Sequence, residues 1–115
     1  MSVRCGQILL VSYPFTDTSG SKIRPALVVS ADAYNQGEDF VVIPFSTVPP
    51  PDDRWALTFR DTAPGFGQTG LRGTSYIRWT KPMTISEKVV ARRLGSLPSK
   101  ILSEVQVKLQ GMFQM

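Results

Sequence analysis

The hydrophobic positions of this chain fall in short runs that predict β-strands. The runs occupy residues 8–11 (ILLV), 26–29 (ALVV), 40–43 (FVVI), 55–59 (WALTF), 76–79 (YIRW) and 89–94 (VVARRL). Branched and aromatic residues dominate them, as is typical of strands that are buried on at least one face. We therefore expect five strands and a short sixth one at residues 89–94.

Loop-forming residues separate these runs. Residues 17–21 (DTSGS), 49–53 (PPPDD) and 63–67 (APGFG) combine the residue types that favour turns. The whole chain contains nine glycines and nine prolines among 115 residues. This frequency fits many short strands better than a bundle of helices.

The C-terminal segment follows a helical periodicity. From Ser99 onward the apolar positions are Ile101, Leu102, Val105, Leu109, Met112 and Phe113, with polar residues between them. Pro98 is compatible with a helix start because the first N–H groups of a helix lack intrahelical partners. Residues 31–36 could form a second, short helix. The pattern predicts a mainly β fold, a small antiparallel β-barrel closed by one amphipathic helix, in a single domain spanning residues 1–115.

The amino-acid composition excludes several kinds of catalytic site and a disulfide. The chain has one cysteine and no histidine. Catalytic triads and dyads that use histidine, paired-histidine ribonuclease chemistry and histidine-ligated zinc are therefore excluded. A single cysteine also excludes an internal disulfide, so the apolar core alone must stabilise the fold. We expect no cofactor and no metal.

Charge and hydropathy indicate a soluble protein of the reduced cytoplasm. Hydrophobic residues make up 42% of the chain and charged residues 19%, a balance too apolar for intrinsic disorder. No apolar run approaches the roughly 20 residues of a membrane span, and the first residues do not have the pattern of a signal peptide. The formal net charge of +4 permits an anionic partner without requiring one.

Arg24 is the first candidate functional residue. It precedes Pro25 at the start of a predicted strand, and proline restricts the residue before it to extended geometry, so the arginine has a defined direction. A guanidinium held in this way can bind a phosphate through two parallel N–H donors. The alternative, an arginine solvated at the rim of the barrel, stays open at this point.

Hydroxyl and aromatic groups mark two further strand ends. Ser46 and Thr47 follow the most hydrophobic strand, where hydroxyls either cap a turn or bind a phosphate oxygen. Strand alternation places Tyr76 and Arg78 on one face. Such a pair can hold a phosphate and stack a base, although a tyrosine that supports an exposed arginine fits the same pattern.

Three other motifs have simpler interpretations. The Arg92–Arg93 step can bind phosphate, but a basic pair is more often a solvated strand edge. Asp52 and Asp53 point apart on an extended chain, which favours a solvated loop over a metal site. Cys5 has no neighbour in the sequence that would activate its thiol.

Several blocks of the sequence together resemble the MazF/PemK family of toxins. They are residues 6–11 (GQILLV), 13–17 (YPFTD), 24–30 (RPALVVS), 42–47 (VIPFST) and 76–85 (YIRWTKPMTI), followed by the C-terminal helix. The resemblance spans nearly the whole chain. Blocks in this order and at this spacing are more specific than an isolated Arg-Pro step.

Membership in that family would imply an SH3-like β-barrel homodimer and a metal-independent endoribonuclease. Such an enzyme cuts single-stranded RNA at short preferred sequences by attack of the 2′-hydroxyl on the adjacent phosphate, which leaves a 2′,3′-cyclic phosphate and a 5′-hydroxyl. Cleavage of mRNA in this way inhibits translation and growth. The implied partner is a cognate antitoxin whose acidic tail occupies the RNA groove. Operator DNA would be bound only together with that antitoxin.

The resemblance also implies roles for individual positions. Arg24 matches the catalytic arginine of the family, Ser46 the catalytic threonine of most members, and Thr47 a second hydroxyl. Arg78 matches an additional arginine of PemK-type members. Thr80 stands where that branch has an aspartate, and the loop histidine of the branch has no counterpart here.

These departures leave the general base unassigned. Cleavage needs one group to take the proton of the 2′-hydroxyl, another to protonate the leaving oxygen, and charge stabilisation between them. Our hypothesis is that Arg24 and Ser46 orient the phosphate and that Arg78 is the second cation and the acid. Asp17 or a water would be the base. Support for RNA binding would come from Thr47, Tyr76 and Thr80.

A second class of function fits the same barrel. It is a non-catalytic toxin or nucleic-acid-binding protein, for example one that poisons DNA gyrase as the fold-related CcdB does. The intact Arg24–Pro25 step favours the nuclease, whereas Thr80 in place of the aspartate favours the alternative. Apolar surface for a homodimer would come from Trp55, Trp79, Met112 and Phe113.

Overall fold

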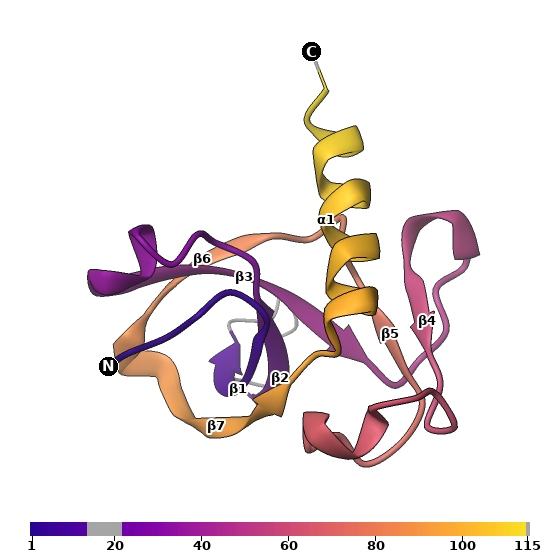
Figure 1. Cartoon of the computed structure of the whole chain (residues 1–115), viewed down its shortest axis with the longest axis horizontal. Helices are drawn as coiled ribbons and strands as arrows, with labels where there is room; N and C mark the ends of the chain where they lie inside the picture. The colour runs from indigo at the N-terminus through magenta and orange to yellow at the C-terminus, as the bar shows by residue number, and fades with distance from the viewer. Residues whose placement is uncertain (14–21, 115) are drawn as a thin grey trace.

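The computed structural model describes residues 1–13 and 22–114, and this part of the chain holds seven strands and one α-helix. They are β1 (Gln7–Tyr13), β2 (Lys22–Val28), β3 (Asp39–Ser46), β4 (Leu57–Phe59), β5 (Ser75–Ile77), β6 (Met83–Ser86), β7 (Val90–Ser96) and α1 (Ser99–Met112). The 3₁₀ turns are Tyr34–Gln36, Asp53–Trp55, Phe66–Thr69 and Glu87–Val89. The predicted class, mainly β with one C-terminal helix, is confirmed (Figure 1).

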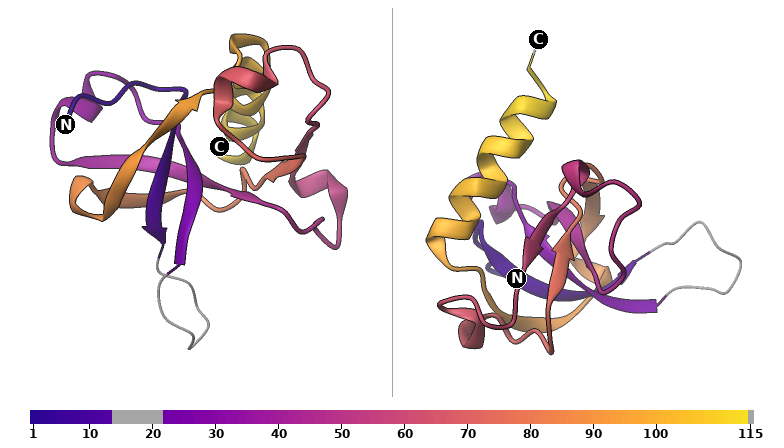
Figure 2. Two further views of the ribbon diagram at one scale, coloured as in Figure 1. Left: turned by 90° about the horizontal axis from the view of Figure 1, so that it is seen from below. Right: turned by 90° about the vertical axis from the view of Figure 1, so that its right-hand side faces the viewer.

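The strands form one curled antiparallel sheet. Their order is β4-β5-β3-β2-β1-β7, and β6 pairs with β3 beside this path. The two ends of the path, β4 and β7, do not pair with each other within the described residues, so the barrel expected from the sequence is curled but not closed (Figure 2). The short β6 was not predicted, because Met83–Ser86 follows Pro82 directly and carries only two apolar side chains.

Pro25 ends the pairing between β2 and β3. The N–H of Val29 donates to the Val41 carbonyl oxygen of β3 at 2.9 Å. Because the N–H groups of a strand point alternately to its two sides, the backbone nitrogen of Pro25 also faces β3. Proline has no N–H to donate, and the pairing accordingly stops at Ala26↔Pro44 while β2 stays paired with β1.

Pro44 marks the corresponding change in β3. The first half of β3 pairs with β6 as far as Val42, and the second half pairs with β5 from Phe45 onward. Pro44 lies between these two ladders, and its carbonyl oxygen accepts the N–H of Arg78 at 3.0 Å. The sheet therefore forks: β2 continues with β1, and β3 continues with β5.

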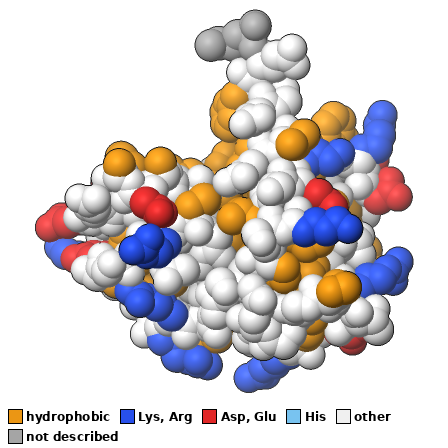
Figure 3. Space-filling model, viewed as in Figure 1, with side chains coloured by type: hydrophobic (Ala, Val, Ile, Leu, Met, Phe, Trp, Pro, Cys, Tyr) orange, Lys and Arg blue, Asp and Glu red, His pale blue; other side chains and the backbone are white. Residues whose placement is uncertain are grey.

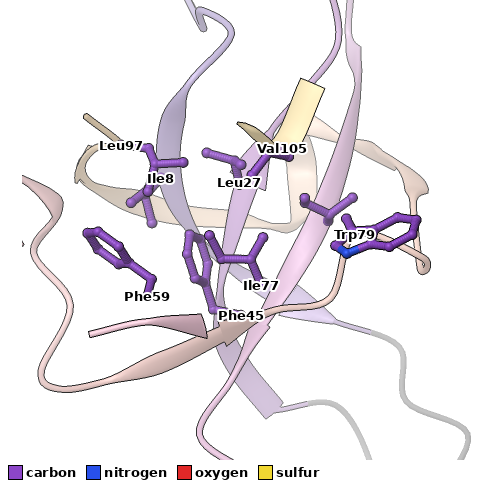
Figure 4. Packing of buried hydrophobic residues seen from close by; sticks show 9 residues of the cluster. Ile8, Leu27, Phe45, Phe59, Ile77, Trp79, Leu97 and Val105 are labelled. Carbon is purple, nitrogen blue, oxygen red and sulfur yellow. The ribbon is translucent and has the colours of Figure 1, made fainter. Parts of the chain in front are cut away.

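Side chains from the two faces of the sheet form two apolar cores. The first core joins β1, β2, β3 and β6 and contains Val3, Leu9, Val11, Ala26, Val28, Phe40, Val42 and Ile85. The second core joins β1, β2 and β3 to β4, β5 and α1. It contains Ile8, Leu27, Ile43, Phe45, Phe59, Ile77, Trp79, Leu97 and Val105 (Figure 4). Neighbouring residues of one strand enter different cores because side chains alternate across a sheet.

The helix α1 covers the second core. Val105 is fully buried there, and half-buried residues one turn away, Ile101 and Leu109, pack beside it. The Pro98 carbonyl oxygen accepts the N–H of Leu102 at 3.0 Å, which confirms the predicted helix start. The C-terminal half of α1 extends beyond the strands (Figure 2). No helix in the described ranges is long and apolar enough to cross a membrane.

Three local predictions differ from the structure. The strand expected at residues 55–59 is confined to β4 (Leu57–Phe59), because Asp53–Trp55 forms a 3₁₀ turn in which the Asp52 carboxylate accepts the N–H of Arg54. Residues 76–79 were expected to form a strand, but β5 ends at Ile77 because the next four residues form a turn, closed by the N–H of Lys81 and the carbonyl oxygen of Arg78 at 3.1 Å. Where residues 31–36 suggested a second short helix, the chain forms only the 3₁₀ turn Tyr34–Gln36.

The two tryptophans have different environments. Trp79 was expected to provide apolar surface for a dimer, and this is wrong: only 4% of it is exposed, because it packs in the second core. Trp55 lies in the 3₁₀ turn before β4 and is 50% exposed. The two rings contact each other with centroids 5.9 Å apart.

Two glycines let the 3₁₀ turn Phe66–Thr69 lie directly against β7. A Cβ atom on Gly95 would stand 2.1 Å from the Gln68 carbonyl oxygen, and one on Gly70 would stand 2.5 Å from the Leu94 carbonyl oxygen. Gly70 also has a φ of +74°, a conformation that favours glycine. This close backbone approach holds the segment that follows the turn beside β7.

Candidate functional site

A cavity of about 240 Å³ lies in the fork between β2 and β3. Its lining comes from the start of β2, the end of β3 and the start of β5, and consists of Arg24, Pro25, Phe45, Ser46, Thr47 and Ser75. The structure thus brings together three residues that the sequence singled out, Arg24, Ser46 and Thr47. The two prolines that fork the sheet create the opening.

Cross-strand register explains why Arg24 and Ser46 meet. β2 and β3 pair Ala26 with Pro44, and the same register continued by two residues puts Arg24 opposite Ser46. On its other side Ser46 pairs with Tyr76 of β5. Residues directly opposite in antiparallel strands carry their side chains on the same face. Arg24, Ser46 and Tyr76 therefore form one row across three strands.

The Ser46 hydroxyl caps the turn that follows β3. It accepts the N–H of Val48 at 3.1 Å and donates to the carbonyl oxygen of Val48 at 3.2 Å. The turn-capping interpretation of this hydroxyl is therefore observed. To donate to a phosphate, the hydroxyl would have to exchange the Val48 carbonyl for a phosphate oxygen, and both groups lie on the exposed surface where this exchange is feasible.

Arg78 and Thr80 do not line this cavity. Arg78 opens the turn that follows β5, where its N–H donates to the Pro44 carbonyl oxygen at 3.0 Å. The Nε atom of Arg78 is buried and has no hydrogen-bond partner within the described part of the chain. Thr80 is half-buried in the turn after β5.

The candidate base from the sequence is the Asp17 carboxylate. Asp17 lies outside the described residues. Among the described residues that line the cavity, Arg24 is the one ionisable side chain, so no carboxylate faces it there. Residues 1–13 and 22–114 contain no group of three or more histidine, cysteine, aspartate or glutamate side chains that could hold a metal ion.

The acidic pair after the three prolines belongs to a solvated loop, as its sequence indicated. The Asp52 carboxylate accepts the backbone N–H of Arg54 at 3.0 Å and contacts the Arg54 guanidinium at 2.6 Å. This guanidinium lowers the pKa of Asp52, and the carboxylate raises the pKa of Arg54. Arg54 also lies over the Trp55 ring, 5.5 Å from its centroid. The ion pair of Asp52 and Arg54 therefore orders a surface turn.

Cys5 has no sign of activation. Burial raises the pKa of its thiol, the nearby Asp32 carboxylate raises it further, and a hydrogen bond from Gln106 opposes them. A raised pKa lowers the fraction of reactive thiolate at neutral pH. The prediction of an inert thiol agrees with this environment.

Ser75 is a lining residue that the sequence reading missed. It opens β5, is 5% exposed, and its hydroxyl donates to the carbonyl oxygen of Gly73 at 3.0 Å. The sequence could have indicated Ser75 as a candidate, because it is a hydroxyl residue at a strand end, as Ser46 is. Only the pairing of β5 with β3 brings the two hydroxyls to one cavity.

Comparisons with known proteins give a family and a fold. The sequence model of one family, the PemK-like, MazF-like toxin of type II toxin–antitoxin systems, matches residues 4–113. The chain superposes on MazF from Deinococcus radiodurans with a TM-score of 0.75 and 20% identity, covering 100% of this chain and 99% of that chain. It superposes on a MazE–MazF complex from the same organism with a TM-score of 0.72 and 22% identity, covering 100% of this chain and 99% of that chain.

A third structure extends this comparison to another group of bacteria. An endoribonuclease in complex with its cognate antitoxin from a mycobacterial species superposes with a TM-score of 0.70 at 17% identity, covering 96% of this chain and 91% of that chain. No curated protein matches the sequence. At these identities the superpositions demonstrate a shared fold.

Proposed function

The chain belongs to the PemK-like, MazF-like toxins of type II toxin–antitoxin systems, and on this premise we propose that it is an endoribonuclease that cuts single-stranded RNA without a metal ion. One observation carries the proposal: Arg24 and Ser46, at the two positions that resemble the catalytic residues of the family, line the same cavity. A solved structure of the same fold is named an endoribonuclease.

The dimensions of the cavity fit a phosphodiester group. The cavity has a volume of about 240 Å³, which is below the range of about 300–1,000 Å³ for pockets that enclose a whole small ligand. It therefore suits one group of a larger molecule, such as a phosphate, better than a complete nucleotide. Arg24 supplies a positive charge to it, and Ser46, Thr47 and Ser75 supply hydroxyls. A phosphate flanked by two nucleotides would place its charged oxygens here while the nucleotides lie outside.

The proposed reaction is an internal transfer followed by release. The 2′-oxygen of the substrate attacks the adjacent phosphorus and loses its proton to a base, while the bond from phosphorus to the 5′-oxygen breaks and that oxygen gains a proton. The products are a 2′,3′-cyclic phosphate and a 5′-hydroxyl. Arg24 stabilises the negative charge that develops on the phosphorane, and Ser46 donates a hydrogen bond to it.

Arg78 has a supporting role in this proposal. It is the second cation and the acid that protonates the leaving oxygen, and it acts through its terminal nitrogens because Nε is buried. A guanidinium stays protonated and makes a poor base, so the base is Asp17 or a water. Thr47, Tyr76 and Thr80 support RNA binding around the row formed by Arg24 and Ser46.

The same premise gives the proposed partners. A cognate antitoxin would block the RNA-binding surface, and two of the structures that share this fold are complexes of a toxin with its antitoxin. We further propose a homodimer in the cytoplasm that binds operator DNA only together with the antitoxin. Cleavage of mRNA would then inhibit translation and growth when the toxin is free.

Mapping the ends of cleaved RNA tests the proposal. Purified protein is incubated with single-stranded RNA in the presence of EDTA, and the fragment ends are identified. We expect cyclic phosphate and 5′-hydroxyl ends with the unmodified chain and a rate lower by about 10²–10³ for Arg24→Ala, as for loss of one charge-stabilising donor. Arg60→Ala removes an exposed arginine outside the cavity; it is the control and keeps the rate.

Two results would overturn the nuclease. One is full cleavage by Arg24→Ala, and the other is loss of cleavage by the unmodified chain when EDTA is added. If the unmodified chain arrests growth but leaves RNA intact, the non-catalytic class is supported instead. A DNA gyrase supercoiling assay then tests the CcdB-like alternative.

A further inference from the structure

A second, larger cavity adjoins the first. It has about 440 Å³ and shares Pro25, Thr47 and Ser75 with the cavity in the fork. This volume lies within the range of about 300–1,000 Å³ that small-ligand pockets occupy. A chain molecule whose phosphate fills the smaller cavity can therefore extend directly into the larger one.

The lining of the second cavity combines apolar walls with positive charge. Leu10, Ile23 and Leu94 are among its apolar residues, and Arg72 and Arg92 are exposed arginines. No aspartate or glutamate is among the described residues of the lining. Two cations beside an apolar wall suit a ligand that is anionic at one end and flat and apolar at the other.

Strand register and backbone packing hold the two arginines in place. Leu10 of β1 pairs with Pro25 on one side and with Arg92 of β7 on the other, so these three residues form a row across the sheet. Arg72 follows Gly70, whose close contact with Leu94 fixes this segment beside β7. The cavity is thus built on the sheet and its packed connection.

The two arginines of the Arg92–Arg93 step have different roles. Arg92 lines the cavity, whereas the guanidinium of Arg93 donates to the carbonyl oxygen of Ser2. Basic side chains also gather along the lower left margin of the molecule, where β7 runs (Figure 3). The strand therefore presents one arginine to the cavity within a positively charged edge.

We propose that the second cavity binds the nucleotide next to the scissile phosphate of single-stranded RNA. Its base lies against Leu10, Ile23 and Leu94, and its outer phosphate binds Arg72 and Arg92. This proposal rests on the proposed nuclease for the position of the scissile phosphate. It adds a binding subsite that makes a longer substrate better than a dinucleotide.

Cleavage of two substrates of different length tests this subsite. The rates on a dinucleotide and on a ten-nucleotide RNA are compared for the unmodified chain and for the double variant Arg72→Ala/Arg92→Ala. We expect the advantage of the longer RNA in kcat/KM to fall about ten-fold in the double variant, through KM. The slope of log KM against log salt concentration should also fall by about 0.7, since Arg72 and Arg92 neutralise one phosphate and each neutralised phosphate of a single strand contributes about 0.7.

The control is Arg60→Ala, which removes an exposed arginine that lines neither cavity. It should retain the advantage of the longer RNA. An equal loss on both substrates, or no loss on the longer one, would overturn the subsite. A change of sedimentation coefficient in the double variant without a change in length preference would also overturn it, because a second copy of the chain would then cover this cavity.

A binding measurement separates failure of the subsite from failure of the nuclease. Fluorescence anisotropy with a 2′-O-methyl RNA needs no cleavage. If the unmodified chain binds this RNA, and the double variant binds it about ten-fold more weakly, the subsite stands even where no RNA is cut. If RNA is cut but its length and the two arginines have no influence, the nuclease stands and the subsite is wrong.

Discussion

At the residue scale, Ser46 has a capping function that the structure shows and a phosphate-binding function that we propose. Its hydroxyl caps the turn after β3 through both backbone groups of Val48, and it also lines the cavity that holds Arg24. The sequence offered capping and phosphate binding as alternatives, and the structure shows the capping. The hydroxyl has one rotatable proton, so in the proposed phosphate binding it would donate to a phosphate oxygen instead of the Val48 carbonyl, while its oxygen continues to accept the Val48 N–H. A fixed turn also limits the positions the hydroxyl can take.

Substitution of Ser46 separates the two functions. Ser46→Ala should lower the free energy of unfolding by about 1 kcal/mol, the net contribution of a typical hydrogen bond, and should lower kcat by about 10²-fold or more. Ser46→Thr keeps a hydroxyl and should retain most of both. Urea denaturation and single-turnover cleavage measure the two effects. Equal kcat for the alanine and threonine variants would show that the hydroxyl has only the capping function.

Cys5 gives a prediction about pH. Burial raises the pKa of its thiol, so modification by a thiol reagent should rise with pH around a midpoint above the ordinary value of about 8.5. Because the folded pKa is the higher one, the contribution of the thiol to stability is fully present below about pH 8.5 and is lost as pH rises through the folded pKa. Modification rates measured from pH 7 to 11, with and without guanidinium, test this. A folded midpoint below 8.5 would contradict it.

At the element scale, two prolines decide where strands part. Pro25 has no N–H to offer β3, and Pro44 lies where β3 exchanges β6 for β5. Both prolines are visible in the sequence, but each could equally have stood on an outer edge of the sheet, where proline is common. The fork follows only when the neighbours of β2 and β3 are known.

Glycine substitutions test the contact that supports the second cavity. In Gly95→Ala the new Cβ would meet the Gln68 carbonyl oxygen at 2.1 Å, so either β7 or the 3₁₀ turn must move. We expect a loss of several kcal/mol in the free energy of unfolding, typical of severe overpacking. Thermal denaturation followed by circular dichroism measures it.

Gly111→Ala is the matched control for that prediction. Gly111 lies in α1, and a Cβ atom there would meet nothing within 4 Å. Alanine should stabilise the helix by about 0.5–1 kcal/mol, because glycine loses more backbone entropy. If both variants lost stability equally, the close packing of β7 would not be the cause.

At the scale of the whole molecule, apolar residues remain on the surface. Trp55 in the turn before β4, Val107 on α1 and Phe113 directly after α1 are each at least half exposed. Met112 is half-buried. With Trp79 in the core, the surface available to the proposed homodimer consists of these other residues. Burial of such surface between two copies would be favourable.

The proposed homodimer predicts that thermal stability depends on concentration. Association stabilises the folded chain by mass action, so a hundred-fold increase in protein concentration should raise Tm by a few degrees. Calorimetry over this range measures the shift, and sedimentation velocity gives the mass. A constant Tm together with a monomer at micromolar concentration would count against the homodimer.

The sequence by itself determined the local elements of this protein. Runs of branched residues gave the strands and the 3.6-residue period gave α1, because these patterns act through backbone preferences and neighbouring side chains. The same local reasoning singled out Arg24 and Ser46 as candidate functional residues. Arg24 has a defined direction because proline restricts the residue before it, and Ser46 is a hydroxyl at a strand end. This reasoning missed β6 and Ser75, whose own residues carry only a weak signal.

Only the tertiary structure decided how these parts meet. Arg24 and Ser46 are 22 positions apart in the chain, and Leu10 and Arg92 are 82 apart. Whether such residues come close in space depends on which strands pair and in what register. The same pairing buried Trp79, directed Arg92 and Arg93 to different partners, and joined two cavities at the fork. Long-range pairing is set by the packing of all strands together, and a local pattern cannot specify it.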